Sequence, residues 1–255
     1  MTTTGDGGAL VLLRHGQSAY NAADVFTGWS DAPLSDLGVA QARGAAAALR
    51  ALGVRPTSVH TSLLRRSIAT AEIVADALGR GWVPVHRSWR LNERHYGALT
   101  GLDKRAVAAG VDAAVFHAWR RSFAVAPPPM SEDAAAVMYA DDRYADLPVE
   151  LRPRTESLAD VWVRTLPYWS DVLLPRVRAG ETPLVVGHGN SLRAFVMYLE
   201  KLGPADVERL DIPTAVPMRY RVDREGNPYA EPGGRYLDPV GAREQVRVGP
   251  VAIGP

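Results

Sequence analysis

The segment LVLLRHGQSAYN, residues 10–21, runs an unbroken apolar stretch directly into an arginine, a histidine and a glycine. A short continuous run of aliphatic residues is typical of a strand that is covered on both faces of a sheet. The same order, an apolar run followed by His-Gly, returns in PLVVGHGN at residues 183–190. Strands of this kind need helices on both faces, so these two segments favour an α/β fold.

Strand and helix alternate through much of the remaining chain. Residues 35–53 combine Ser35 as an N-cap candidate, alanine-rich helical spacing and Gly53 as a stop signal. Residues 156–180 are amphipathic, and we expect a helix there despite Pro167. The pattern predicts an α/β fold with a mostly parallel central sheet flanked by helices. The expected strands lie within 9–16, 58–62 and 82–89, further helices within 64–79 and 115–123, and a strand followed by a helix within 182–203.

The length and apolar content suit one large core. A chain of 255 residues with 47% hydrophobic residues is expected to form a single domain, here residues 10–240, with a flexible tail at 1–9 and a mobile tail at 241–255. The strand and helix rhythm breaks between about 103 and 153, where prolines interrupt the pattern. We interpret this stretch as an insertion that lies over the sheet and the active site.

Composition excludes several classes of protein. Lys and Arg number 29 against 28 Asp and Glu, so no excess charge is available to coat a nucleic acid or an anionic membrane surface. Cysteine is absent, which excludes disulfides, thiolate nucleophiles and cysteine-ligated metals. No apolar stretch approaches the roughly 20 residues of a membrane helix. We therefore expect a soluble, cytoplasmic protein.

Two histidines are placed where an α/β sheet binds its ligands. Ligands of open parallel sheets bind beyond the carboxyl ends of the strands, so His15 and His188 are expected at the same rim. Gly16 and Gly189 follow them and permit close approach of the backbone to a ligand, and the helices that begin nearby offer free N–H groups to an anion. A lone histidine is more often structural, but two at matching strand exits favour a functional site.

Arginines near the same rim indicate an anionic ligand. Arg14 precedes His15, Arg65 and Arg66 follow the strand at 58–62, and Lys104, Arg120 and Arg121 lie in the insertion. An isolated pair of arginines usually belongs to a solvated surface. In a chain of nearly neutral net charge, their convergence with two histidines points instead to a site for a small anion such as a phosphoryl group.

These residue types fit phosphoryl transfer. A neutral imidazole can attack phosphorus, and neighbouring arginines should lower the pKa of His15 and so keep it neutral. Arg14, Arg66 and His188 could then stabilise charge on the transferring group. Glu93 is the best-placed proton carrier, although a local salt bridge with Arg94 is an alternative role for its carboxylate. The remaining histidines show no metal-like spacing and are expected to be structural or peripheral: His60, His86, His95 and His117.

Longer stretches extend these observations to most of the chain. They are LRHGQSAYN, FTGWSDAPLSDLG, TSLLRRSIATA, LNERHYGALTGLDK, WRRSFAVAPPP, ESLADV with LPYW, VVGHGNSLRA and IPTAVP. Together they resemble the cofactor-dependent phosphoglycerate mutases of the histidine phosphatase superfamily, in the family's order from about Leu10 to GRYLDP in the tail. RHG alone indicates only the superfamily, whereas ERHYG, the paired arginines before the prolines and GHGNSLR are more specific.

The resemblance implies a fold, a reaction and a set of residues. The fold would be phosphoglycerate mutase-like, and the reaction the interconversion of 3-phosphoglycerate and 2-phosphoglycerate in glycolysis and gluconeogenesis, primed by 2,3-bisphosphoglycerate without a metal. His15 would carry the phosphohistidine, Glu93 would be the general acid and base, and Arg14, Arg66 and His188 would hold the phosphoryl group. The substrate-contact positions implied by the resemblance are Arg14, His15, Gly16, Gln17, Ser18, Ala19, Tyr20, Asn21, Thr27, Gly28, Arg66, Glu93, Arg94, His95, Tyr96, Lys104, Arg120, Arg121, Gly189 and Asn190.

Two other functions remain open at this point. A phosphomonoesterase of the same superfamily would use His15 in the same way but let water reach the phosphohistidine. An inactive phosphate-binding module would not need both histidines and Glu93, so their presence argues against this function. The expected partners are small phosphoglycerates and, as one possibility, further copies of the same chain.

Overall fold

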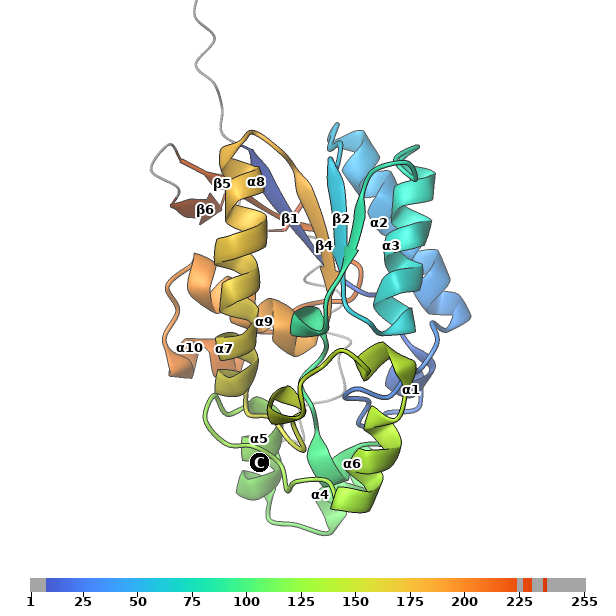
Figure 1. Cartoon of the computed structure of the whole chain (residues 1–255), viewed down its shortest axis with the longest axis vertical. Coiled ribbons are helices and arrows are strands. Elements are labelled where there is room, and N and C mark those ends of the chain that lie inside the picture. The colour runs from blue at the N-terminus through green and yellow to red at the C-terminus, as the bar shows by residue number, and fades with distance from the viewer. Residues whose placement is uncertain (1–7, 224–226, 231–235, 238–255) are drawn as a thin grey trace, which may run out of the picture.

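The computed structural model describes residues 8–223, 227–230 and 236–237. Within these residues, a sheet of six strands has the order β3-β2-β4-β1-β5-β6 (Figure 1). The first four are mutually parallel, and β5 and β6 are antiparallel additions, so the predicted mostly parallel sheet is confirmed. The strands are β1 Ala9–Arg14, β2 Ser58–Thr61, β3 Val85–Arg87, β4 Pro183–Gly187, β5 Met218–Val222 and β6 Pro228–Ala230.

The two segments that end in His-Gly form neighbouring strands at the centre of this sheet. Val11 of β1 pairs with Leu184 of β4, and Arg14 with Gly187. Every residue of β4 is buried, as a strand covered on both faces requires. This register brings the residues that follow the two strands, His15 and His188, to one rim.

Helices cover both faces of the sheet (Figure 1). Alternate residues of β1 enter two separate cores: Leu10 and Leu12 pack with α7 to α9, whereas Val11 and Leu13 pack with α2 and α3. Both layers match the amphipathic stretches in the sequence. The helices of the domain are α1 Ala19–Ala22, α2 Asp36–Ala51, α3 Arg65–Ala77, α7 Leu158–Tyr168, α8 Leu174–Arg178, α9 Gly189–Leu199 and α10 Pro204–Arg209.

The stretch around Pro167 is helical with an irregular turn. Helix α7 passes through Pro167 into a π-helical turn, Trp169–Leu173, which continues into α8. Proline lacks the N–H that the helical ladder needs, and a wider turn next to it absorbs the break. The buried side of this turn contributes Trp169 and Leu173 to the core.

Three strands differ from expectation: β3 is shorter, and neither β5 nor the three-residue β6 is predicted. The third strand is shorter than the predicted 82–89, because Pro84 cannot donate a ladder bond and Ser88 caps a 3₁₀ turn, Trp89–Leu91. Strand β5 was not predicted. Its signal is a period of two, since Met218, Tyr220 and Val222 are buried and the residues between them only half-buried.

The mid-chain insertion lies beyond the carboxyl ends of the parallel strands (Figure 1). It contains the helices α4 Lys104–Ala109, α5 Ala113–Arg121 and α6 Glu132–Tyr139. Tyr139 and Tyr144 of the insertion pack around Trp29, which comes from the loop after β1. The insertion therefore builds a small core of its own against that loop, next to the rim that carries the histidines.

The ends of the chain fall largely outside this description. Residues 1–7, the predicted C-terminal tail 241–255 and most of the GRYLDP segment lie outside the described residues. Gly8 donates its backbone N–H to the carbonyl of Val177, and β1 begins directly after it. No helix in the described parts of the chain is long and apolar enough to cross a membrane.

Candidate active site

His15 and His188 face each other at the rim of the sheet. Their ring centroids are 4.9 Å apart in an edge-on arrangement, and both residues are buried. Each follows the last residue of its strand, and the backbone N–H of His15 donates to the carbonyl of Gly187 at 3.0 Å. The paired strands thus fix the distance between the two imidazoles.

The hydrogen bonds of His15 determine its tautomer. Nδ1 lies 2.6 Å from the carbonyl oxygen of Gly16, which can only accept, so Nδ1 carries the proton. Nε2 is left with its lone pair, which accepts a hydrogen bond from Nε–H of Arg66 at 3.3 Å. Burial, then the charges of Arg66 and Arg14, hold the pKa of His15 well below its usual value. The ring is therefore a neutral imidazole at neutral pH, and within the described residues the lone pair on its Nε2 accepts only the hydrogen bond from Arg66.

Two arginines are held rigidly beside His15. Arg66, near the start of α3, donates to the carbonyls of Ser30 and Gly28, both at 2.8 Å, and burial lowers its pKa to about 10. Gly28 has a φ of +51°, a conformation that favours glycine and turns its carbonyl toward Arg66. Arg14 donates from Nη1 to the carbonyl of Ile212 at 2.6 Å, while its buried Nε has no partner among the described residues.

His188 contacts a hydroxyl on one side only. Its Nε2 lies 2.8 Å from Oγ of Ser62, which follows β2. Its Nδ1 is buried and has no hydrogen-bond partner in the described part of the chain. Burial, followed by the charge of Arg66, holds the pKa of His188 well below its usual value. The site thus keeps a second neutral imidazole with one unsatisfied ring nitrogen.

Glu93 reaches this rim from the loop after β3. Oε1 of its carboxylate accepts from the backbone N–H of Arg94 at 2.7 Å and from the backbone and side chain of Asn190 at 3.1 and 3.0 Å. A Cβ placed on Gly189 would lie 3.7 Å from Oε2 of Glu93 and 3.8 Å from Cζ of Arg14. The carboxylate therefore lies close to the guanidinium of Arg14.

The alternative role for Glu93, a local salt bridge with Arg94, does not occur in the structure. The guanidinium of Arg94 turns away and donates to the carbonyls of Trp119 and Arg120 in the insertion, and it lies 4.6 Å above the ring of Tyr96. Its buried Nε and Nη1 have no partner among the described residues. Burial raises the pKa of Tyr96, but the charge of Arg94 together with the hydrogen bonds of Arg94 and Asn190 outweighs it, and the net pKa is lowered.

Sequence reasoning missed the pair that holds the Glu93 loop. Arg164 of α7 forms an ion pair with Glu156 at 2.6 Å, and both side chains are almost completely buried. The same guanidinium donates to the carbonyls of Asn92 and Glu93, each at 3.0 Å. An arginine on the buried side of an otherwise apolar helix face is the signal that could have found it.

Comparisons with known proteins show the family of this chain. Residues 10–139 match the model of the histidine phosphatase superfamily (branch 1). The chain is 49% identical over 237 residues, 93% of this chain and 96% of the relative, to the 2,3-bisphosphoglycerate-dependent phosphoglycerate mutase of Thermobifida fusca. It is 50% identical, over 92% of this chain and 94% of the relative, to that of Corynebacterium glutamicum. This chain belongs to the 2,3-bisphosphoglycerate-dependent phosphoglycerate mutase family.

Solved structures of the wider superfamily share the fold. A mycobacterial glucosyl-3-phosphoglycerate phosphatase superposes with a TM-score of 0.65 at 28% identity, over 84% of this chain and 92% of that one. The phosphoglycerate mutase of Bacillus anthracis has the same TM-score at 18% identity, over 96% of this chain and all of the other, and supports the fold alone. A phosphatase and a mutase thus share this fold.

The loop after β1 packs tightly on α2 in this family member. A Cβ on Gly16 would lie 2.2 Å from the carbonyl oxygen of Gly38, and one on Gly38 would lie 2.0 Å from that of Gln17. Ser18 caps the short helix α1 in a box with Asn21. Of the other residues that the family resemblance placed here, Ala19 and Tyr20 lie in α1 and Thr27 is buried in the loop before Gly28.

Each cation of the insertion contacts a neighbouring side chain. Lys104 donates to Asp24 at 2.8 Å, Arg121 pairs with Asp211 at 2.7 Å, and Arg120 lies 5.3 Å above the ring of Phe116.

His95 turns into the insertion core, where its ring contacts Trp29, so the structure does not bring its side chain to the histidine pair. The other imidazoles also lie elsewhere: His60 and His86 stack on each other across β2 and β3.

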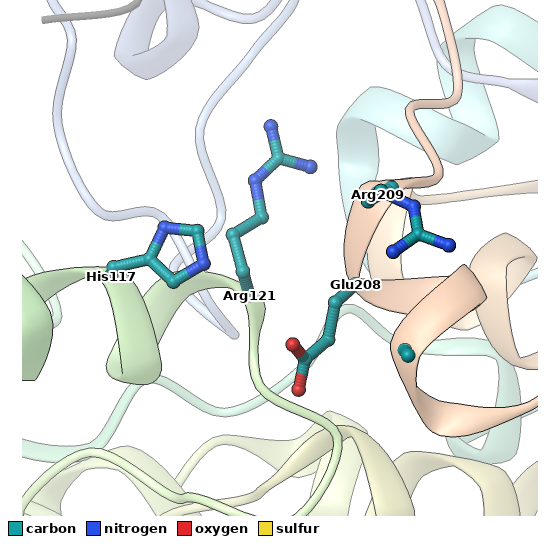
Figure 2. A pocket seen from close by; sticks show the side chains of 5 residues that line it. His117, Arg121, Glu208 and Arg209 are labelled. Carbon is teal, nitrogen blue, oxygen red and sulfur yellow. The ribbon is translucent and has the colours of Figure 1, made fainter.

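Arg121 also borders a separate pocket of about 360 Å³ between α5 and α10 (Figure 2). His117 and Arg121 reach it from α5, and Glu208 and Arg209 from α10. Across the described residues, no group of three or more His, Asp or Glu side chains is placed to hold a metal ion.

Proposed function

We propose that this chain interconverts 3-phosphoglycerate and 2-phosphoglycerate through a phosphohistidine on His15, primed by 2,3-bisphosphoglycerate. The observation that carries the proposal is the tautomer of His15: its Nδ1–H donates to the carbonyl of Gly16, and its Nε2 keeps a lone pair that accepts from Nε–H of Arg66. A neutral imidazole held in this way is prepared for attack on phosphorus. The relatives named above provide the reaction class.

The residues around His15 fit a phosphoryl group. Nε of Arg14 and Nδ1 of His188 are buried without partners among the described residues, although buried donors are nearly always satisfied. Anionic oxygens of a phosphoryl group would satisfy them, and Arg66 would neutralise a further oxygen. Because these groups are already fixed by the backbone, little reorganisation is needed when negative charge spreads over the equatorial oxygens.

Glu93 moves the proton. When Nε2 of His15 attacks the phosphorus of 2,3-bisphosphoglycerate, the bond from phosphorus to the leaving oxygen breaks, and Glu93 donates a proton to that oxygen. In the return step Glu93 removes the proton from the hydroxyl that attacks the phosphohistidine. The Oε1 atom is held by Asn190 and the backbone, so Oε2 is the oxygen that exchanges the proton.

Retention of the intermediate explains isomerisation. The bisphosphoglycerate formed on transfer must turn in the site so that its other phosphate returns to His15. Arg94, Lys104, Arg120 and Arg121 supply the cations for the rest of the substrate, and the insertion that carries the last three excludes water. We place this reaction in the cytoplasm, in glycolysis and gluconeogenesis.

Product analysis tests the proposal. Purified protein is given 3-phosphoglycerate with a trace of 2,3-bisphosphoglycerate, and 2-phosphoglycerate and inorganic phosphate are both followed. We expect rapid isomer formation that depends on the trace, with little free phosphate. His15→Ala should abolish isomerisation and stable labelling, and an unchanged rate in this variant would overturn the assignment of the nucleophile.

A phosphatase is the second candidate, because a glucosyl-3-phosphoglycerate phosphatase shares the fold at 28% identity. The same assay separates the two functions. Release of phosphate without isomer would establish the phosphatase, and neither product would favour an inactive phosphate-binding module.

A further inference from the structure

A chain of buried hydroxyl groups runs from the end of β2 to His188. Oγ1 of Thr61 lies 2.8 Å from Oγ of Ser67, which lies 2.5 Å from Oγ of Ser62. Oγ of Ser62 lies 2.8 Å from Nε2 of His188 and also accepts the backbone N–H of Leu64 at 3.1 Å. All three hydroxyl residues are completely buried.

We propose that Ser62 is a positioning residue that sets the tautomer of His188, so that Nδ1–H of this imidazole faces the phosphoryl group. The inference rests on the proposed function, in which His188 binds the group that His15 transfers. It adds a residue that acts only through His188.

The hydroxyl chain can be oriented in two directions. In the first, Thr61 donates to Ser67, Ser67 to Ser62, and Ser62 to Nε2 of His188, which places the ring proton on Nδ1. In the second, Nε2–H donates to Ser62, Ser62 to Ser67, and Ser67 to the carbonyl of Leu64 at 3.1 Å. The second direction leaves a bare lone pair on Nδ1.

The free nitrogen of His188 selects the first direction. Nδ1 is buried without a partner in the described chain, on a ring whose centroid is 4.9 Å from that of His15. A phosphoryl oxygen can only accept hydrogen bonds, so it requires N–H at this atom and is repelled by a lone pair. Because His188 is neutral in its buried position, protonation of both nitrogens does not supply the donor, and the tautomer must.

The alternative is that Ser62 only fills space at the end of β2. Ser58 provides a matched control, because its buried Oγ lies 3.0 Å from Nε2 of another buried histidine, His60, on the same strand. Ser58→Ala removes an equivalent hydroxyl-to-imidazole bond away from the site. Ser62→Ala and Ser58→Ala are therefore similar structural losses with different predicted consequences for catalysis.

The experiment combines kinetics with direct observation of the tautomer. We expect Ser62→Ala to lower kcat roughly tenfold to a hundredfold, with a smaller change in KM. This is the effect of losing one hydrogen bond to a charged group, here the bond from Nδ1–H of His188 to the phosphoryl group. Ser67→Ala should lower kcat less, since Ser62 keeps its hydroxyl, and Ser58→Ala should change it less than about twofold. Equal effects of Ser62→Ala and Ser58→Ala would overturn the proposal.

The tautomer is read by ¹⁵N NMR of histidine-labelled protein with orthovanadate as the phosphoryl mimic, and the signal of His188 is assigned with His188→Gln. We expect the proton on Nδ1 in the natural chain and a shift toward Nε2 in Ser62→Ala. A proton on Nε2 in the natural chain would overturn the proposal, even if Ser62→Ala does not fold. Absence of mutase activity in the natural chain would contradict the proposed function instead. The NMR result would still decide whether Ser62 sets the tautomer of His188.

Discussion

Oε1 of Glu93 lies 3.0 Å from the side-chain nitrogen of Asn190 and 3.1 Å from its backbone nitrogen, although the two residues are 97 positions apart in the sequence. The loop after β3 and the start of α9 are thereby joined at the proposed proton carrier. Asn190 is held in turn by Arg193, whose Nη1 donates to its side-chain oxygen at 3.0 Å.

Removal of the side-chain amide of Asn190 should impair proton transfer by Glu93. We expect Asn190→Ala to lower kcat about tenfold, because Glu93 loses one of its fixed donors. Asn190→Asp should lower it further, since a second carboxylate would lie against the first. Steady-state kinetics with 3-phosphoglycerate checks both variants, and equal rates for alanine and aspartate would mean that charge at this position has no effect on the step.

Two glycines of α2 should respond in opposite ways to the same substitution. Gly38→Ala places a methyl group 2.0 Å from the carbonyl oxygen of Gln17, so we expect a lower free energy of unfolding and a loss of activity as the loop after β1 shifts. Gly44 has nothing within 4 Å of its Cβ position, and Gly44→Ala should raise the free energy of unfolding by about 0.5 to 1 kcal/mol. Urea denaturation measures both, and a destabilised Gly44→Ala protein would contradict the packing described for α2.

The buried ion pair below Glu93 should be essential for stability. Arg164→Met leaves Glu156 buried without its partner and frees the carbonyls of Asn92 and Glu93, so we expect a loss of about 3 to 5 kcal/mol and a fall in kcat. The exposed pair of Arg209 and Asp206 is the control, and Arg209→Met should cost less than about 1 kcal/mol. Denaturant midpoints compare the two, and a loss of similar size in both would show that burial of the pair is unimportant.

Acid should weaken the fold through buried neutral histidines. Burial, with the charges of His86 and Arg176, lowers the pKa of His60 to about 3, below the value of about 6.5 in the unfolded chain. The unfolded chain therefore binds more protons between these values, so the stabilising contribution is complete above about pH 6.5 and is lost as pH falls. At about pH 5 we expect His60 alone to cost about 2 kcal/mol relative to neutral pH.

Urea denaturation at neutral pH and at about pH 5 measures this effect. His60→Gln should reduce the difference between the two conditions by about 2 kcal/mol. An undiminished difference in His60→Gln would mean that other groups dominate the acid sensitivity.

The central fold could be predicted because its signals are local. The apolar runs that end at Arg14 and Gly187 required a doubly covered sheet, and the N-cap Ser35 and the spacing after it defined α2. Strand β5 was missed because its alternation extends over only five residues, Met218–Val222. In addition, its partner β1 lies near the opposite end of the sequence, so no local pattern reveals the pairing.

The residue types of the chemistry and the rim on which they meet could be read from the sequence, because strand ends and the residues that follow them form local patterns. The packed fold was needed to show that Nδ1 of His15 carries the proton, that Glu93 is held by Asn190 and not by the guanidinium of Arg94, and that Ser62 contacts His188. These contacts depend on atoms from segments 97 to 126 residues apart or on the orientation of one ring. Neither is encoded in a local pattern, because hydrogen-bond geometry is fixed only when packing brings the segments together.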